Sequence, residues 1–302
     1  MRRFLALSRS RHGILDVAMP GFVALLWLGR FPPWPVLLLS LLTAFAGYTA
    51  IYALNDLVGV KVDREKFAAA APNRGYSVEA SDLRYPLARN LLSVRSAMAW
   101  FVSWFVLALI GAYLLNPLIV LIAIAAGVLE LVYCKLLQVT YWRILVSGLV
   151  KSAGPIAAVF VVAPEPSVRL LFLLLAWLIC WEIGGQNIPA DWNDIEEDKR
   201  IGAKTIPLAF GPQVAGTLIV VALSLTVILG LFLPLMSPLV LGLPYLAATV
   251  AAGLCLLLLP ALQLYRSHDS RMAAKLFDRA SLYPLAQLMI ILVFVFFGRH
   301  SH

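Results

Sequence analysis

Apolar runs of about 20 residues recur along the whole chain, and they constrain its fold more than any other feature. Each run is long enough to cross the hydrocarbon core of a bilayer as a helix. Of 302 residues, 62% are hydrophobic and 13% are charged, and the mean hydropathy of +0.89 is outside the range of soluble proteins. We therefore predict an all-α fold, a polytopic bundle of transmembrane helices, rather than one or two soluble domains.

The positions of these runs predict nine transmembrane helices arranged around a central cavity. We expect one domain, residues 1–302, because no polar segment is long enough to form a second. The two largest polar loops are 58–93 and 191–212. The predicted spans are 14–30, 34–57, 94–115, 117–135, 143–163, 168–190, 213–233, 238–264 and 281–297.

Basic residues gather on one side of the predicted bundle. The N-terminus and the loops after the second, fourth, sixth and eighth spans hold 20 of the 24 lysines and arginines. The positive-inside rule assigns this side to the cytoplasm, and the odd number of spans puts the C-terminus on the other side. We expect an integral multi-pass protein of a prokaryotic cell (inner) membrane. Its two polar loops, 58–93 and 191–212, would cap an active site that faces the cytoplasm.

Two acidic segments stand at the predicted cytoplasmic ends of spans. They read NDLVGVKVD and DWNDIEED, and in each the outer acids are seven residues apart. In a continuous helix that spacing places the side chains on one face, two turns apart. The residues concerned are Asn55, Asp56 and Asp63 in the first segment, and Asn187, Asp191, Asp194 and Asp198 in and before the second.

The residue types in these segments predict a metal site. Oxygen ligands without a histidine or cysteine partner favour hard cations such as Mg²⁺, which commonly shares a phosphate oxygen of its substrate. Nearby basic residues, Arg74 in one loop and Lys199, Arg200 and Lys204 in the other, would neutralise the rest of a diphosphate. For the first segment taken alone, a polar helix end with interfacial salt bridges is an equally open interpretation.

Polar side chains also occur inside or near the apolar runs. They include Asp16, Glu130, Lys151 and Glu182. Charges within a membrane usually face a cavity or a partner, because an isolated ion in hydrocarbon is costly. Lys151 is expected either to line the site or to pair with Glu130 or Glu182. Asn187, one turn before the second acidic segment, is predicted to line the site.

With these segments identified, the sequence resembles the UbiA-type intramembrane prenyltransferases over essentially its whole length. NDLVGVKVD and DWNDIEED are similar to the two aspartate-rich signatures of that family, and the following KRIGAKTIP is also family-like. Asn73-Arg74 resembles the start of an Asn-Arg-Pro element, and Tyr133 with Lys135 resembles a Tyr/Lys element. The chain departs from the pattern at Gly59, where the family usually has an acid, and at Gly75, which replaces a proline.

The resemblance implies an Mg²⁺-dependent enzyme that transfers a polyprenyl group from a prenyl diphosphate to a lipophilic acceptor, which captures a carbocation. An aromatic quinone precursor is the expected acceptor, with a glycerol phosphate or a tetrapyrrole as alternatives. Membrane lipids are the implied surroundings, with no nucleic acid and no obligate protein partner. The implied metal ligands are Asn55, Asp56, Asp63, Asp191, Asp194 and Asp198, of which the aspartates are also catalytic. The implied substrate-binding residues are Asn55, Arg74, Tyr133, Lys135, Asn187, Lys199 and Lys204.

Two other classes of function remain open at this point. A membrane transporter would also place acids near a cavity, but it usually shows inverted repeats with broken helices at the bilayer midplane. The acids here lie at span ends, and the glycine and proline interruptions form no obvious matched pair. A non-catalytic binding protein that kept the fold and lost a metal ligand is the second alternative, and Gly59 is its support.

Overall fold

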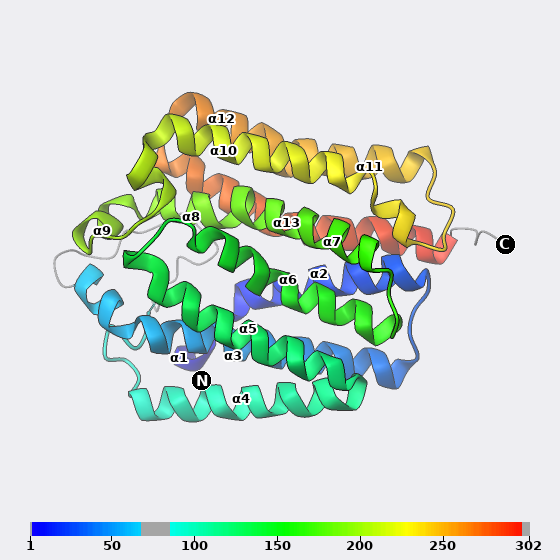
Figure 1. Cartoon of the computed structure of the whole chain (residues 1–302), viewed down its shortest axis with the longest axis horizontal. Coiled ribbons are helices and arrows are strands. Elements are labelled where there is room, and N and C mark those ends of the chain that lie inside the picture. Colours follow the sequence, from blue (N-terminus) through cyan, green and yellow to red (C-terminus); the bar gives the residue numbers. More distant parts are fainter. Residues whose placement is uncertain (1, 68–84, 298–302) are drawn as a thin grey trace.

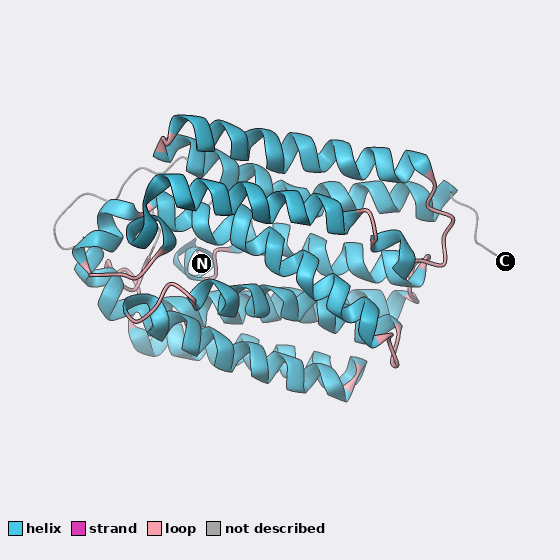
Figure 2. Ribbon diagram, turned by 45° about the horizontal axis from the view of Figure 1, so that its top comes forward, coloured by secondary structure: helices cyan, strands magenta, loops and turns pink. Residues whose placement is uncertain are grey.

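The computed structural model describes residues 2–67 and 85–297, and these residues are helical apart from short connections. The long helices lie side by side along the longest axis of the molecule, and the connections lie at its two ends (Figures 1 and 2). The predicted all-α bundle is therefore confirmed. That the chain forms a single domain stays a prediction.

Thirteen α-helices and four shorter helical segments make up the described part of the chain. The α-helices are α1 (Arg2–Leu7), α2 (Ser10–Leu28), α3 (Trp34–Phe67), α4 (Val94–Leu115), α5 (Pro117–Lys135), α6 (Arg143–Val162), α7 (Val168–Trp181), α8 (Ile188–Asn193), α9 (Ile195–Arg200), α10 (Ile206–Gly230), α11 (Leu243–Gly253), α12 (Leu259–Ser267) and α13 (Ser270–Phe297). The shorter segments are the 3₁₀ turns η1 (Leu136–Gln138) and η3 (Leu233–Met236) and the π-helical η2 (Glu182–Asn187) and η4 (Leu254–Leu258).

Within residues 2–67 and 85–297, eight helices are long and apolar enough to cross a membrane, one fewer than the nine predicted. The remaining predicted span, 14–30, corresponds to α2, whose apolar part His12–Leu28 is shorter. Gly29 ends this helix with a φ of 69°, and a Cβ atom there would lie 2.6 Å from Pro238 Cγ. Only glycine fits that turn without strain. The position of α2 against α3, α6 and α13 still makes it part of the bundle.

The two polar segments contain more helix than we predicted. Residues 58–67, expected to begin a loop, continue α3 as far as Phe67. Most of the second segment, 191–212, is also helical, since it holds the end of α8, all of α9 and the start of α10. Charged residues can extend a helix beyond the apolar run once its backbone leaves the hydrocarbon region, so hydropathy alone ends the helix too early.

Local capping explains the tight turn between α4 and α5, at the opposite end of the bundle from α9. Asn116 separates α4 from α5, and its Oδ1 accepts a hydrogen bond of 3.0 Å from Leu118 N. Pro117 follows at the first helical position, where its missing N–H is not needed. This two-residue signal, visible in the sequence, reverses the chain between antiparallel helices.

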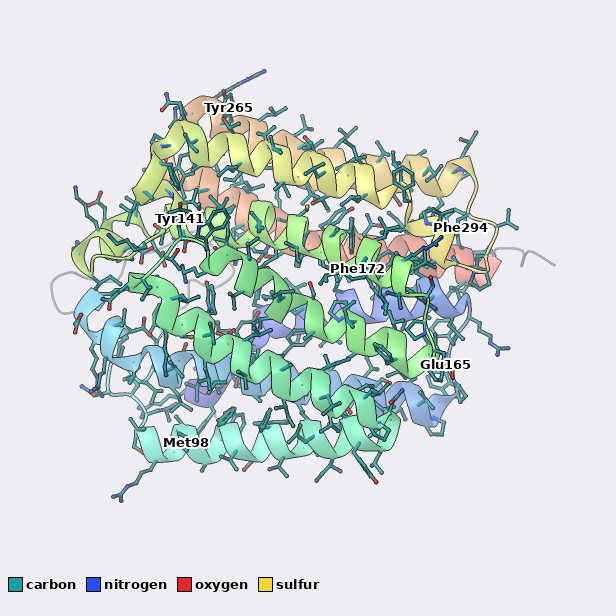
Figure 3. All side chains as sticks on the ribbon, viewed as in Figure 1. Met98, Tyr141, Glu165, Phe172, Tyr265 and Phe294 are labelled. Atoms are coloured by element: carbon teal, nitrogen blue, oxygen red, sulfur yellow. The ribbon has the colours of Figure 1, made fainter. Side chains whose placement is uncertain are left out.

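Burial separates the inside of the bundle from its outer surface. The aromatic side chains of Phe22, Trp177 and Tyr283 are fully buried between helices from both halves of the chain. In contrast, Met98 on α4 and Phe172 on α7 are exposed, and many large apolar side chains of the outer helices share that exposure (Figure 3). An apolar surface of this kind is suited to contact with lipid.

Candidate active site

The first acidic segment lies in the last four turns of α3. Asp56 is buried, while Asn55 and Asp63 are half-buried. Arg9, at the break between α1 and α2, reaches both motif residues: its Nη2 lies 3.2 Å from Asn55 Oδ1 and 3.4 Å from Asp56 Oδ1. Arg9 adopts a left-handed φ of 44°, which turns the chain at this point. The N-terminus thus supplies a cation to the first acidic segment.

Asn55 is held from two sides. Its Oδ1 accepts from Arg9, and its Nδ2 donates a hydrogen bond of 2.5 Å to Oε1 of the buried Glu130 on α5. Further along α3, the Asp63 carboxylate folds back over Gly59, where a Cβ atom would lie 3.1 Å from Asp63 Oδ2. A larger side chain at Gly59 would crowd that carboxylate.

The second acidic segment is a broken helix rather than the continuous one we predicted. After α7 the chain passes through π-helical η2, α8 and α9, and Asp194 between the last two has a non-helical ψ of 15°. Asp191 and Asp198 are buried on separate short helices, while Asp194 is half-buried at the break. The prediction that Asn187 to Asp198 share one face of a single helix is therefore wrong, because the break at Asp194 changes the helical register.

An ion pair joins the two acidic segments. Lys66 Nζ, near the end of α3, lies 2.5 Å from Asp198 Oδ1 on α9, and both side chains are nearly buried. The C-terminal end of α3 and α9 therefore lie at the same end of the bundle, on the left in Figure 1, and α13 ends on the right. The two segments meet at one end, as the sequence-based orientation requires.

Asp191 has its own buried cation. Arg143 Nη2, at the start of α6, lies 2.5 Å from Asp191 Oδ1, and the guanidinium lies 4.7 Å from the centre of the Tyr133 ring. Tyr133 Oη in turn accepts a hydrogen bond of 3.1 Å from Asn187 Nδ2. The structure thus brings two of the predicted substrate-binding residues, Tyr133 and Asn187, next to Asp191.

The other predicted substrate-binding residues do not join the buried contacts around Asp191. The side chains of Lys135, Lys199 and Lys204 are exposed at this end of the bundle. The backbone of Lys204 is fixed, since its N–H donates to Leu137 O at 2.7 Å. Arg74 lies outside the described residues.

Sequence reasoning missed three cations that contact the acids: Arg9, Lys66 and Arg143. They contribute to the predicted orientation, but the sequence alone indicates no partner for them. All three stand at helix ends on the predicted cytoplasmic side, and that shared position is the signal that could have identified them. For Lys151, the expected pair with Glu130 or Glu182 is wrong, because its Nζ pairs with Asp16 Oδ2 at 2.8 Å. The alternative, that Lys151 lines the site, stays a prediction.

The electrostatics of Asp198 reflect its burial. Loss of hydration raises the pKa of the Asp198 carboxyl, and the nearby Lys66 ammonium acts in the opposite direction. A divalent cation would favour the ionised form further. The cationic groups of the site and a bound metal would therefore act in the same direction, because both favour the ionised Asp198 carboxylate.

The donor set fits Mg²⁺ shared with a phosphate-bearing ligand. Asp191 Oδ2 and Asn187 Oδ1 are buried and have no hydrogen-bond partner within the described part of the chain. Among the residues described, no three His, Cys, Asp or Glu side chains are close enough to hold an ion by themselves. That spacing suits Mg²⁺, which is usually bound by one or two carboxylates plus substrate phosphates instead of an all-protein cage.

Comparison with known proteins agrees with this geometry. The model of the UbiA prenyltransferase family matches residues 17–291. A digeranylgeranylglyceryl phosphate synthase of Methanopyrus kandleri is 29% identical over 74% of this chain and 75% of its own length. A 4-hydroxybenzoate octaprenyltransferase of Saccharophagus degradans is 25% identical over 62% of this chain and 58% of its own length. A UbiA homologue of Archaeoglobus fulgidus, solved with DMAPP and Mg²⁺, aligns with a TM-score of 0.68 and 20% identity over 96% of this chain and 99% of its own.

Proposed function

The chain belongs to the UbiA prenyltransferase family, and from that premise we propose that it transfers a prenyl group from a prenyl diphosphate to a lipophilic acceptor. One observation carries the proposal: the Lys66–Asp198 ion pair brings the acidic segments of α3 and α9 to the same end of a membrane-spanning bundle. Carboxylates gathered from two segments, with basic side chains between them, suit a metal-bound diphosphate.

The proposed metal ligands are those named from the sequence: Asn55, Asp56, Asp63, Asp191, Asp194 and Asp198. When bound, Mg²⁺ would stabilise the negative charge that the diphosphate gains as the C–O bond breaks. The A. fulgidus homologue solved with DMAPP and Mg²⁺ supports this choice of ion.

The chain's own cations would bind the leaving group. Lys66 and Arg143 lie against the acids, so a small change of side-chain rotamer would bring their N–H groups to diphosphate oxygens. We propose that Arg9, Lys66 and Arg143 contribute in this way, alongside the exposed Lys199 and Lys204. The electron pair of the broken C–O bond leaves with the diphosphate, and these donors stabilise it there.

Aromatic faces would stabilise the remaining allylic cation. The ring of Tyr133 holds the Arg143 guanidinium 4.7 Å from its centre, so this ring already takes part in one cation–π contact. Asn187, hydrogen-bonded to the Tyr133 hydroxyl, would orient that ring. Tyr133 is therefore a positioning and charge-stabilising residue in this proposal and not a nucleophile.

For the acceptor, we place a prenylated glycerol phosphate first. The M. kandleri synthase supports it through the greater identity and coverage. Our sequence-based first choice, an aromatic quinone precursor, becomes the second candidate and is supported by the S. degradans 4-hydroxybenzoate enzyme.

The protein is an integral multi-pass membrane protein, given the eight apolar helices in the described part of the chain and its family. We propose that the end with the acidic segments faces the cytoplasm of a prokaryotic cell, as the distribution of lysine and arginine predicts. In this orientation the charged diphosphate group of the donor would reach the site from the aqueous side of the membrane.

The test is a product screen with purified protein in detergent or nanodiscs. Prenyl diphosphates of several lengths and Mg²⁺ are combined with geranylgeranylglyceryl phosphate or 4-hydroxybenzoate, and products are identified by mass spectrometry. We expect an ether-linked lipid with the first acceptor. Binding of prenyl diphosphate without any prenylated product would favour the non-catalytic alternative, and uptake of diphosphate into proteoliposomes would favour a transporter.

A further inference from the structure

A second polar cluster lies deeper in the bundle than the acidic segments. Tyr52, one turn before Asp56 on α3, hydrogen-bonds to the Asp16 carboxylate on α2. Lys151 Nζ on α6 contacts both, at 2.8 Å from Asp16 Oδ2 and 2.6 Å from Tyr52 Oη. Three helices thus contribute to one network within the apolar bundle, and the proposed diphosphate site uses none of these three residues.

Glu182 stands beside this network. Its Oε1 accepts a hydrogen bond of 2.6 Å from Ser147 Oγ, and Ser147 lies one turn before Lys151 on the same face of α6. Glu182 is only 3% exposed, and its Oε2 has no hydrogen-bond partner in the part of the chain that is described. A buried acceptor without a donor is costly, so a ligand that donates a hydrogen bond is its natural partner.

The local backbone also sets Glu182 apart. It begins the π-helical η2, a departure from regular helix that is frequent at functional sites. The same segment ends at Asn187 and leads into Asp191, so η2 connects the deeper cluster to the proposed diphosphate site. A group bound at Glu182 would therefore lie deeper in the bundle than the diphosphate.

Lys151 is the partly exposed member of this cluster, whose other residues are buried. The Lys151 side chain retains 21% of its exposure although it stands in the middle of a transmembrane helix. An ammonium at that depth is stable when it faces a partner or a polar cavity, and here it has both a carboxylate partner and remaining exposed surface. Lys151, with three N–H donors, can thus donate to a ligand without leaving the network, whereas the single O–H of Tyr52 already donates to Asp16.

The charge balance limits what can bind. Lys151 faces the Asp16 and Glu182 carboxylates, and His12 Nε2 lies 3.6 Å from Asp16 Oδ1. Even with His12 protonated, two cations balance two carboxylates, so the cluster has no surplus positive charge for a phosphate or a benzoate. A neutral hydroxyl fits better, because it can donate to Glu182 Oε2 and accept from Lys151. An anionic head group would instead remain near Arg9, Lys66 and Arg143.

We propose that Glu182, Lys151, Tyr52 and Asp16 form the subsite for the reacting hydroxyl of an alcohol acceptor, and that Glu182 receives its proton. The inference rests on the proposed prenyl transfer. The prenyl C–O bond breaks and its electron pair leaves with the diphosphate. The acceptor oxygen forms the new C–O bond, and its proton passes to Glu182 Oε2. Lys151, held by Asp16 and Tyr52, orients the oxygen.

The first test separates ionisation of the donor from capture by the acceptor. Glu182→Gln keeps the size and the Ser147 hydrogen bond but removes the carboxylate. We expect transfer to geranylgeranylglyceryl phosphate to fall at least ~100-fold, while diphosphate release with water capture, which yields prenyl alcohol, continues. Glu165→Gln, an exposed change at the other end of the bundle, is the matched control and should transfer normally (Figure 3). Equal loss of both partial reactions in Glu182→Gln would overturn the role of Glu182.

The second test measures acceptor binding without donor, so it decides the subsite even if the wild type forms no product. Tyr52→Phe should weaken binding of geranylgeranylglyceryl phosphate by about tenfold and leave binding of Mg²⁺ with geranyl diphosphate unchanged. The double variant Asp16→Asn with Lys151→Met, which removes both partners of the 2.8 Å ion pair, should do the same. If the affinity for 4-hydroxybenzoate falls and that for the glyceryl lipid does not, the subsite does not take an alcohol and the proposal is contradicted. Unchanged affinity for both acceptors would contradict the subsite, whereas absence of any prenylated product from the wild type would instead contradict the proposed function.

Discussion

Replacing Arg143 by methionine tests how the second acidic segment is held in place. Arg143 is 5% exposed, its Nη2 lies 2.5 Å from Asp191 Oδ1, and Asp191 is 6% exposed. Removing one partner of such a buried pair costs about 3–5 kcal/mol, because the remaining charge has no counter-ion. For a chain of this size that corresponds to a fall in melting temperature on the order of 10 °C.

The measurement is thermal unfolding in detergent, followed by intrinsic tryptophan fluorescence, with and without Mg²⁺. Arg143→Met should melt well below the wild type, and Mg²⁺ should raise its melting temperature more than that of the wild type, because the metal supplies the missing charge to Asp191. The double variant Arg143→Met with Asp191→Asn is the control. It should be more stable than either single variant, because neither charge is left unpaired.

Two outcomes would refute this reasoning. If Arg143→Met melts within a degree or so of the wild type, the Arg143–Asp191 pair contributes nothing to stability. If the double variant is no more stable than the single ones, the loss comes from packing against Tyr133 and not from the unpaired charge of Asp191.

Two further predictions concern α3. Lys66→Met should lower the free energy of unfolding by about 3 kcal/mol through loss of the 2.5 Å contact with Asp198, whereas Lys135→Met, an exposed change, should alter it by less than ~0.5 kcal/mol. Chemical denaturation of both variants measures the difference, and equal values would contradict it. Gly59→Asp places a second carboxylate against Asp63, so the Mg²⁺ concentration for half-maximal turnover should fall about fivefold, a gain of ~1 kcal/mol in metal binding. A higher requirement for Mg²⁺ would show that the added side chain displaces Asp63 instead.

Much of the fold could be predicted from the sequence, because membrane helices are set by local composition. A run of about 20 apolar residues specifies a span without knowledge of its neighbours. Hydropathy failed where polar residues take part in helices. Thus α3 continues through a charged stretch as far as Phe67, beyond the predicted end of that span at residue 57.

The acidic residues of the candidate site could be predicted from the sequence, but the cations that contact them could not. The spacing of Asp191 and Asp198 identified an acidic cluster, since the motif is local. The cations that contact it, Lys66 and Arg143, come from other helices, and such contacts depend on tertiary packing that residue spacing does not encode. The same limit applies to Lys151, for which the sequence offered three acids within spans and no means of choosing among them.

The central claim is that one site, built from both acidic segments, releases diphosphate and transfers the prenyl group with Mg²⁺. The most direct measurement is simultaneous quantification of diphosphate and prenylated product by the purified wild type, Asp56→Asn and Asp198→Asn, with Mg²⁺ and with excess chelator. We predict equal amounts of both products from the wild type with Mg²⁺, and at least ~100-fold less from each variant and in chelator. Full turnover by either variant, or by the wild type in excess chelator, would contradict the claim.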